Sequence, residues 1–167
     1  MSEAQLSGRV WLFAAANLDT DLMMPGATFR LPFSEQVKLV FSANRPGWYE
    51  LVKPGDIIVA GPNFGTGSAR PAPSLFKRLG ISAIVAESFS DLFFRNCVNY
   101  ALPAMACPGI CSKVVEGDEL DLDLLAGRIR NRRTGVEHHG TALPPMLAEI
   151  IAMGGLIPRL RAQGYIA

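Results

Sequence analysis

The fold class that the sequence predicts is α/β. An apolar run at Ile57–Ala60 is typical of a buried strand. A glycine-rich loop follows it, then a helical pattern over about residues 73–79, and then a second apolar strand at Ile81–Ala86. A strand, a loop, a helix and a strand in this order form a βαβ-like unit. In such a unit, the loop between a strand and a helix N-terminus is a place where anions and substrates bind.

The remainder of the chain supplies strands and helices around this unit. Leu120, Leu122 and Leu124 alternate with acidic residues, which is the period of a half-exposed strand, and a return strand completes a β-hairpin. His138 and His139 are expected in a polar surface loop. The other expected elements are a strand at Gly8–Phe13, a helix at Ser34–Phe41 capped by Ser34, a helix that opens at Glu87–Asp91 with Ser88 and Asp91 as a capping pair and runs to about Val98, and a helix at Pro144–Met153.

Length and composition indicate one compact domain spanning residues 1–167. Hydrophobic residues make up 49% of the chain, which argues against disorder. The net charge is +1, so the sequence gives no electrostatic reason to expect nucleic acid or a membrane as a partner. The first residues lack the pattern of a secretory signal, and no apolar run reaches the roughly 18 residues of a membrane span. We therefore expect a cytoplasmic protein.

The chain has three cysteines, Cys97, Cys107 and Cys111. An odd number in a chain of this length is not typical of a disulfide framework. Cys107 and Cys111 could form half of a metal site, but the sequence offers no second pair of ligands. We expect free thiols in a reducing compartment and no metal ligands in this chain.

Three charged residues ahead of the loop are candidate site residues. Asp19 and Asp21 flank Thr20 in a turn-prone segment. The two carboxylates could bind a metal, orient a histidine or an arginine, or cap local N–H groups in an Asx turn. Arg30 lies between two apolar residues, either as a surface charge or as a forked donor for a substrate carboxylate. The local sequence leaves these alternatives open.

The glycine loop admits three interpretations. As a phosphate loop, Gly65-Thr-Gly-Ser-Ala-Arg70 lacks the third glycine of a dinucleotide loop and the ending of a P-loop. As a catalytic loop, it could place Ser68 and Arg70 in one cleft, with Arg70 clamping a carboxylate and positive charge stabilising a Ser68 alkoxide. As a structural element, it is a tight turn with a serine cap. The residues alone do not decide among the three.

Several motifs, taken in order, resemble those of the small subunits of 3-isopropylmalate dehydratase, which form the swivelling domain of the aconitase superfamily. Asn63-Phe-Gly-Thr-Gly-Ser-Ala-Arg70 is similar to the Asn-Phe-Gly-Cys-Gly-Ser-Ser-Arg loop of that family. The resemblance implies an α/β, aconitase-like swivelling β/β/α domain, with a small core sheet flanked by helices and a β-hairpin insertion. The other similar motifs lie in the same order between about residues 8 and 160: Asp19-Thr-Asp21 with Pro25, Ile81–Phe89, Phe94-Arg-Asn96, Leu102-Pro103, the hairpin turn at Gly117-Asp118, and Gly154-Gly-Leu156.

The resemblance also implies roles for individual residues. Ser68 would be the base that removes, or returns, a proton on the carbon next to a carboxylate. Arg70 would bind a substrate carboxylate, and Asp21 would pair with a catalytic group of a partner chain. Arg30 would face the substituent that separates one substrate from another. The expected substrate-binding residues also include Asn63 and Thr66.

The implied protein is the small subunit of a two-chain hydro-lyase that acts on a small di- or tricarboxylic acid. It would isomerise 2-isopropylmalate and 3-isopropylmalate by dehydration and rehydration, and it would be active only with its large subunit. A [4Fe–4S] cluster bound by the large subunit would act as Lewis acid on the leaving hydroxyl. The same resemblance implies a place in leucine biosynthesis.

Departures from the family pattern leave the substrate open. Thr66 replaces the loop cysteine, and Ala69 replaces a serine whose hydroxyl would contact substrate. Pro71 begins a Pro-Ala-Pro segment in place of Glu-His-Ala, and it carries no N–H. Thr28-Phe29 stands where the family often has Tyr-Leu. The alternatives are a related alkylmalate, citraconate or homoaconitate substrate, or a non-catalytic anion-binding domain of the same fold.

Overall fold

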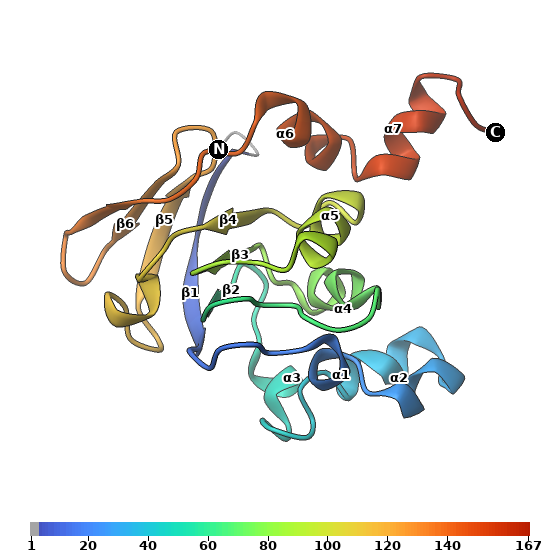
Figure 1. Ribbon diagram of the computed structural model, residues 1–167, viewed down its shortest axis with the longest axis horizontal. Helices are drawn as coiled ribbons and strands as arrows, with labels where there is room; N and C mark the ends of the chain where they lie inside the picture. Colours follow the sequence, from blue (N-terminus) through green and yellow to red (C-terminus); the bar gives the residue numbers. More distant parts are fainter. Residues whose placement is uncertain (1–3) are drawn as a thin grey trace.

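The computed structural model describes residues 4–167, and a curled, mixed β-sheet forms the centre of this range (Figure 1). The sheet has seven strands in the order β4-β3-β2-β1-β5-β6-β7. The strands are β1 Gln5–Phe13, β2 Ile57–Ala60, β3 Ala83–Ala86, β4 Ala104–Ala106, β5 Glu119–Asp123, β6 Arg128–Asn131 and β7 Glu137–His139.

Strand β1 joins the parallel and antiparallel halves of the sheet. Its second half runs parallel to β2, with Val10 opposite Ile57, and its first half runs antiparallel to β5, with Leu6 opposite Leu122. Strands β2, β3 and β4 are all parallel to one another, so their carboxyl ends meet at one edge of the sheet. The sheet is curled, and the chain after β7 returns to β4, where the Thr141 N–H donates to the Ala106 carbonyl at 2.7 Å.

Helices surround the parallel half of the sheet. They are α1 Thr20–Met23, α2 Phe33–Lys38, α3 Trp48–Leu51, α4 Ala72–Leu79, α5 Asp91–Asn99, α6 Pro145–Ala152 and α7 Leu156–Ala162, with 3₁₀ turns η1 at Gly26–Arg30 and η2 at Ile110–Ser112. Helices α4 and α5 lie on one side of β2 and β3, and the β5–β6 hairpin lies on the other (Figure 1).

Two hydrophobic clusters fill the two faces of the sheet, and β2 contributes to both. Ile58 and Ala60 belong to the cluster on the helical side, whereas Ile57 and Val59 belong to the cluster that the hairpin covers. All four side chains are buried, which explains why β2 is a continuous apolar run in the sequence. The helical cluster also contains Phe41, Trp48 and Phe76, while the hairpin cluster contains Leu120, Leu122 and Leu124.

The β2 strand, the hairpin and the helix after the glycine loop are confirmed, but several details of the prediction are wrong. Helix α5 begins at Asp91 with Ser90 as its N-cap, and the Ser88 hydroxyl accepts the Asn63 N–H instead of capping the helix. Ser34 lies inside α2, which Pro32 precedes as the N-cap without a side-chain bond. His138 and His139 form β7 on the outer edge of β6.

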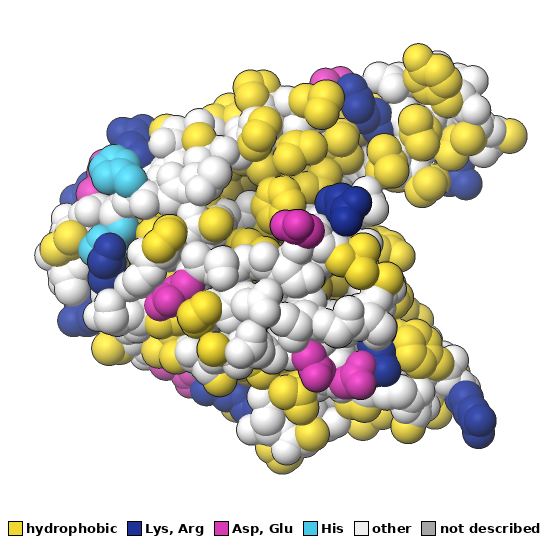
Figure 2. All heavy atoms as spheres, viewed as in Figure 1, with side chains coloured by type: hydrophobic (Ala, Val, Ile, Leu, Met, Phe, Trp, Pro, Cys, Tyr) yellow, Lys and Arg dark blue, Asp and Glu magenta, His cyan; other side chains and the backbone are white. Residues whose placement is uncertain are grey.

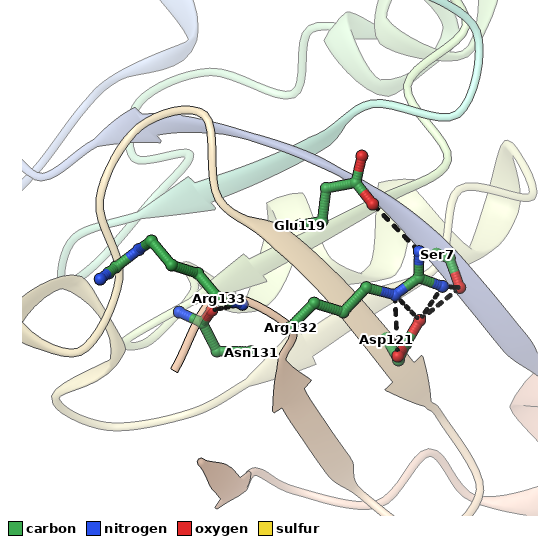
Figure 3. A network of polar contacts seen from close by, with 6 residues as sticks. All are labelled: Ser7, Glu119, Asp121, Asn131, Arg132 and Arg133. Carbon is green, nitrogen blue, oxygen red and sulfur yellow. Dashed lines mark hydrogen bonds and ion pairs between the residues drawn. The ribbon is translucent and has the colours of Figure 1, made fainter. Parts of the chain in front are cut away.

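Arginines pair with the acidic side chains of the hairpin. The Arg132 guanidinium donates to Asp121 at 2.6 Å, to Glu119 at 3.0 Å and to the Ser7 hydroxyl at 3.2 Å (Figure 3). Beneath this exposed network, the Asn131 amide donates to the buried Asp118 carboxylate at 2.7 Å. These contacts join β5, β6 and β1 and hold the hairpin against the rest of the sheet.

Candidate active site

The glycine loop, residues 61–71, leaves the carboxyl end of β2 and is held from both sides by backbone hydrogen bonds. Toward β1, the Gly65 N–H donates to the Leu18 carbonyl at 2.8 Å. Toward β3, the Phe64 N–H donates to the Ser88 carbonyl at 3.0 Å. Short parallel bridges pair Asp19 with Thr66 and Phe64 with Phe89. Backbone pairing therefore extends beyond the ends of the strands into the loop, and the loop has a defined conformation.

Glycine is required at two positions of the loop. Gly65 has φ +83°, and a Cβ there would lie 2.1 Å from the ring of Phe93, so the loop backbone packs directly on α5. Gly67 has φ +93°, a backbone conformation that residues other than glycine rarely adopt. This close packing brings Ser68 to the exposed end of the loop.

Ser68, Arg70 and Asp21 form one polar cluster. Arg70 Nε donates to Ser68 Oγ at 3.0 Å, and Arg70 Nη2 lies 2.7 Å from Asp21 Oδ1. Arg70 Nη1 donates to the carbonyl oxygen of Met24. The guanidinium therefore has three acceptors from two segments, its own loop and α1 with its C-cap, and its side chain is only 16% exposed although it lies at the surface. Its position is fixed before any substrate is present.

The η1 turn supplies the wall beside Arg70. The guanidinium carbon of Arg70 lies 5.3 Å from the centre of the Phe29 ring, within the range of a cation–π interaction. Phe29 remains 53% exposed, so much of the ring is open to a ligand. Arg30, the next residue, is exposed at the end of the same turn. The segment that the resemblance assigns to substrate selection thus lies next to the Ser68–Arg70 pair.

Asn63 and Thr66 belong to a second cluster, centred on Asn17. Asn63 Nδ2 donates to Asn17 Oδ1 at 2.8 Å, and the Thr66 hydroxyl donates to the Asn17 carbonyl at 3.4 Å. Asn17 was not among the predicted site residues. Its position directly after β1, at the same sheet edge as the loop, is the sequence signal that could have found it.

The start of α4 contributes little electrostatic stabilisation. Pro71 and Pro73 have no N–H, and the Ser74 N–H donates to the Pro71 carbonyl at 3.0 Å. Of residues 71–73, only Ala72 keeps a backbone donor. Arg70 is therefore the main positive group beside Ser68.

Asp19 and Asp21 have separate roles. Asp19 caps α1, where its Oδ1 accepts the N–H groups of Asp21 and Leu22 at 2.7 and 3.2 Å. Asp21 instead directs its carboxylate to Arg70 and is 63% exposed. Asp19 therefore forms the Asx-type cap and Asp21 pairs with an arginine, so two of the alternatives that the sequence left open both occur.

The three cysteines are free thiols, and none of them belongs to the Ser68–Arg70–Asp21 cluster. Burial raises the pKa of Cys97 and Cys107, and burial together with the nearby Glu87 carboxylate raises the pKa of Cys111 to about 11. Between residues 4 and 167, no three His, Cys, Asp or Glu side chains come together in a way that could hold a metal ion.

A pocket lies beside the Ser68–Arg70–Asp21 cluster, and Ser68 is not among its lining residues. It has a volume of about 700 Å³ and lies between α5, β4 and α6, with Phe89, Phe94 and Leu147 among its apolar walls. Hydrophobic side chains gather over α5 and α6 in the space-filling view (Figure 2). Ser88, in the wall of this pocket, accepts the Asn63 N–H at 2.8 Å and connects the pocket to the glycine loop.

In residues 4–167, no helix is both long and apolar enough to cross a membrane.

The comparisons with known proteins agree with this architecture. Residues 36–108 match the family model described as the aconitase C-terminal domain. The isopropylmalate/citramalate isomerase small subunit of Methanocaldococcus jannaschii is 44% identical over 160 residues, which are 95% of each chain. The 3-isopropylmalate dehydratase small subunit of Methanosarcina mazei is 40% identical, over 93% of this chain and 96% of the relative.

A solved structure shows the same fold. The crystal structure of 3-isopropylmalate dehydratase (LeuD) from Methanocaldococcus jannaschii matches with a TM-score of 0.88 and 30% identity over 96% of both chains. The curled sheet, the flanking helices and the loop at the sheet edge therefore define an aconitase-type swivelling domain. The chain belongs to the family of 3-isopropylmalate dehydratase small subunits.

Proposed function

We propose that this chain is the small subunit of a two-chain hydro-lyase that interconverts 2-isopropylmalate and 3-isopropylmalate, with Ser68 as the base. One observation carries the proposal: Arg70 Nε donates to Ser68 Oγ at 3.0 Å from a guanidinium that Asp21 and the Met24 carbonyl hold in place. The relatives are named for this reaction, and the loop that carries the pair lies at the sheet edge where such folds bind ligands.

Ser68 would move the proton on the carbon next to a carboxylate. A serine hydroxyl is a weak base, so its alkoxide must be stabilised by donors and positive charge. Arg70 provides both, because its Nε–H points at Oγ and its charge lies beside it. In dehydration, Ser68 Oγ takes the proton from carbon while hydroxide leaves the neighbouring carbon. In rehydration, the same oxygen returns the proton.

Arg70 would also bind the substrate carboxylate. A guanidinium has five N–H donors, and the described contacts use one on each nitrogen. One N–H on Nη1 and one on Nη2 therefore remain for a carboxylate. A carboxylate bound there would lie next to Ser68, which places the adjacent carbon near the base.

The partner is part of the proposal, because the site is open on this chain. Ser68, Asp21 and Asn63 are all exposed, and a site that must exclude water needs a cover. The second carboxylate oxygen of Asp21 is available for a group of the large subunit. Loss of the hydroxyl needs electrophilic help, which the resemblance assigns to a [4Fe–4S] cluster on the large subunit.

The substrate side group would meet Phe29 and Arg30. Phe29 presents an exposed apolar ring beside Arg70, which suits an alkyl substituent such as isopropyl. Arg30 lies farther along the same turn and would limit or favour particular substituents. Asn63 and Thr66, bound to Asn17, would contact the substrate only from the other end of the loop.

A cytoplasmic location is also part of the proposal, and the free cysteines support it.

The test is reconstitution with the large subunit from the same organism. The pair should dehydrate 2-isopropylmalate and hydrate citraconate, measured by the near-ultraviolet absorbance of the unsaturated acid, and each subunit alone should be inactive. A panel of malates with different side groups then ranks the substrates by kcat/KM. A pair that has an intact cluster but is inactive across the panel would contradict the proposal.

A further inference from the structure

Thr20 is a buried residue of α1 that contacts the glycine loop on both sides of Gly67. It is 1% exposed. Its backbone N–H donates to the Thr66 carbonyl at 2.8 Å, and its hydroxyl donates to the Ser68 carbonyl at 2.9 Å. A single residue therefore binds the carbonyl groups of the two residues that flank Gly67.

The Ser68 carbonyl receives a second donor from its own loop. The Arg70 N–H donates to it at 2.8 Å, while the Arg70 side chain donates to Ser68 Oγ. Two donors on one carbonyl oxygen fix the orientation of the peptide that follows Ser68. The direction of the Ser68 Cα–Cβ bond is set by the same backbone, and so is the distance from Oγ to Arg70.

Gly67 allows this contact because it has no side chain. A Cβ at Gly67 would lie 3.2 Å from the Thr20 hydroxyl oxygen, which is tighter than an ordinary contact. The loop backbone is therefore packed directly on the Thr20 hydroxyl. Asp19, as the cap of α1, holds the start of the helix from which this hydroxyl projects.

We propose that Thr20 is a positioning residue for the reaction, whose buried hydroxyl holds the Ser68 peptide and thereby keeps Ser68 Oγ on Arg70 Nε. Thr20 does not face the substrate and acts only through Ser68. The inference rests on the proposed function of Ser68 as the base. Displacement of a catalytic group by about 1 Å can reduce a rate by roughly 100-fold, so loss of one of the two donors matters.

The test compares Thr20→Val with Thr20→Ser in the reconstituted pair. Valine keeps the shape and removes the hydroxyl, and we expect kcat to fall by about 10- to 100-fold. KM should change by less than about threefold, because Arg70 still binds the carboxylate. Serine keeps the hydroxyl and should restore kcat to within about threefold of wild type. Co-purification with the large subunit should be unchanged in both variants.

Ser82→Ala is the matched control. The Ser82 hydroxyl also donates to a backbone carbonyl, that of Gly55 at 2.9 Å, but at the start of β3, far along the sheet from the loop. This variant should lose a similar bond without loss of kcat.

Three results would overturn the assignment of Thr20. Thr20→Val could keep the wild-type kcat, the valine and serine variants could lose kcat equally, or the loss could follow weaker binding of the large subunit. If the valine variant does not fold, Thr20→Ala removes the same hydroxyl, and a kcat equal to that of Thr20→Ser would also contradict the inference. Inactivity of the wild-type pair would instead refute the proposed function itself, and the role of Thr20 with it.

Discussion

Replacement of Arg70 by lysine keeps the positive charge but removes the fork that binds three acceptors. In the structure, separate nitrogens of Arg70 contact the Ser68 hydroxyl, the Asp21 carboxylate and the Met24 carbonyl. A lysine ammonium is a single point of charge on a flexible stem and cannot reproduce this planar arrangement. We expect Arg70→Lys to lose at least the bond to Ser68.

The magnitude follows from the bonds that are lost. A hydrogen bond to a charged group contributes roughly 1.5–3 kcal/mol. Loss of one such bond is about 1.5–3 kcal/mol, and each 1.36 kcal/mol corresponds to about tenfold in rate, so kcat/KM should fall by about 10- to 150-fold, and further if a second bond is lost. Because Arg70 both stabilises Ser68 and binds substrate, kcat should fall and KM should rise together.

The assay is steady-state dehydration of 2-isopropylmalate by the reconstituted pair, with cluster content measured in each preparation. Arg78→Lys is the control, since Arg78 is exposed in the last turn of α4. This control should retain wild-type kinetics. If Arg70→Lys retains kcat/KM within about threefold of wild type, the fixed geometry of Arg70 is not what activates Ser68.

Three further predictions concern substrate choice, acid stability and assembly. Arg30→Ala should change the order of substrates in the malate panel, and unchanged relative kcat/KM values would exclude a role in selection. The Arg133 side-chain bond, together with bonds from Val115 and Asn131, lowers the pKa of the buried Asp118 to about 2 and outweighs the opposing effect of burial. Protonation of Asp118 should therefore remove about 2 kcal/mol from the free energy of unfolding as pH falls from about 4 to about 2. In urea titrations at a series of pH values, Asp118→Asn should lose this pH-dependent part of the stability. Parallel curves of unfolding free energy against pH for the variant and wild type would contradict the prediction. The chain purified alone should be colourless and inactive, and iron–sulfur absorbance in it would contradict a cluster on the large subunit.

The parts of the fold that local patterns determine were predictable from the sequence. Strand β2 is buried on both faces and is therefore a continuous apolar run, and the alternation of leucines in β5 reflects one buried and one exposed face. The start of α5 was not predictable from local capping, because the Ser88 hydroxyl binds the Asn63 N–H from another segment. His138 and His139 form a strand only through pairing with β6, which their own polar sequence does not indicate.

Some residues of the candidate site could be predicted from the sequence, but their pairing could not. The loop motif pointed to Ser68 and Arg70, and the family resemblance pointed to Asp21. The sequence could not show that Arg70 would bind Asp21 within this chain, because the two residues meet only through the bonds between the loop and the segment after β1. The contribution of Phe29 was hidden for the same reason, since its ring reaches Arg70 from the η1 turn.

The most direct test of the account is the effect of Ser68→Ala on turnover by the reconstituted pair. We predict that kcat for dehydration of 2-isopropylmalate falls by about 1,000-fold or more, with cluster content and binding of the large subunit unchanged, because the proton-transferring oxygen is gone. Ala69→Ser, which alters the neighbouring exposed residue without removing the base, should keep substantial activity. Wild-type turnover by Ser68→Ala would contradict the assignment of Ser68 as the base.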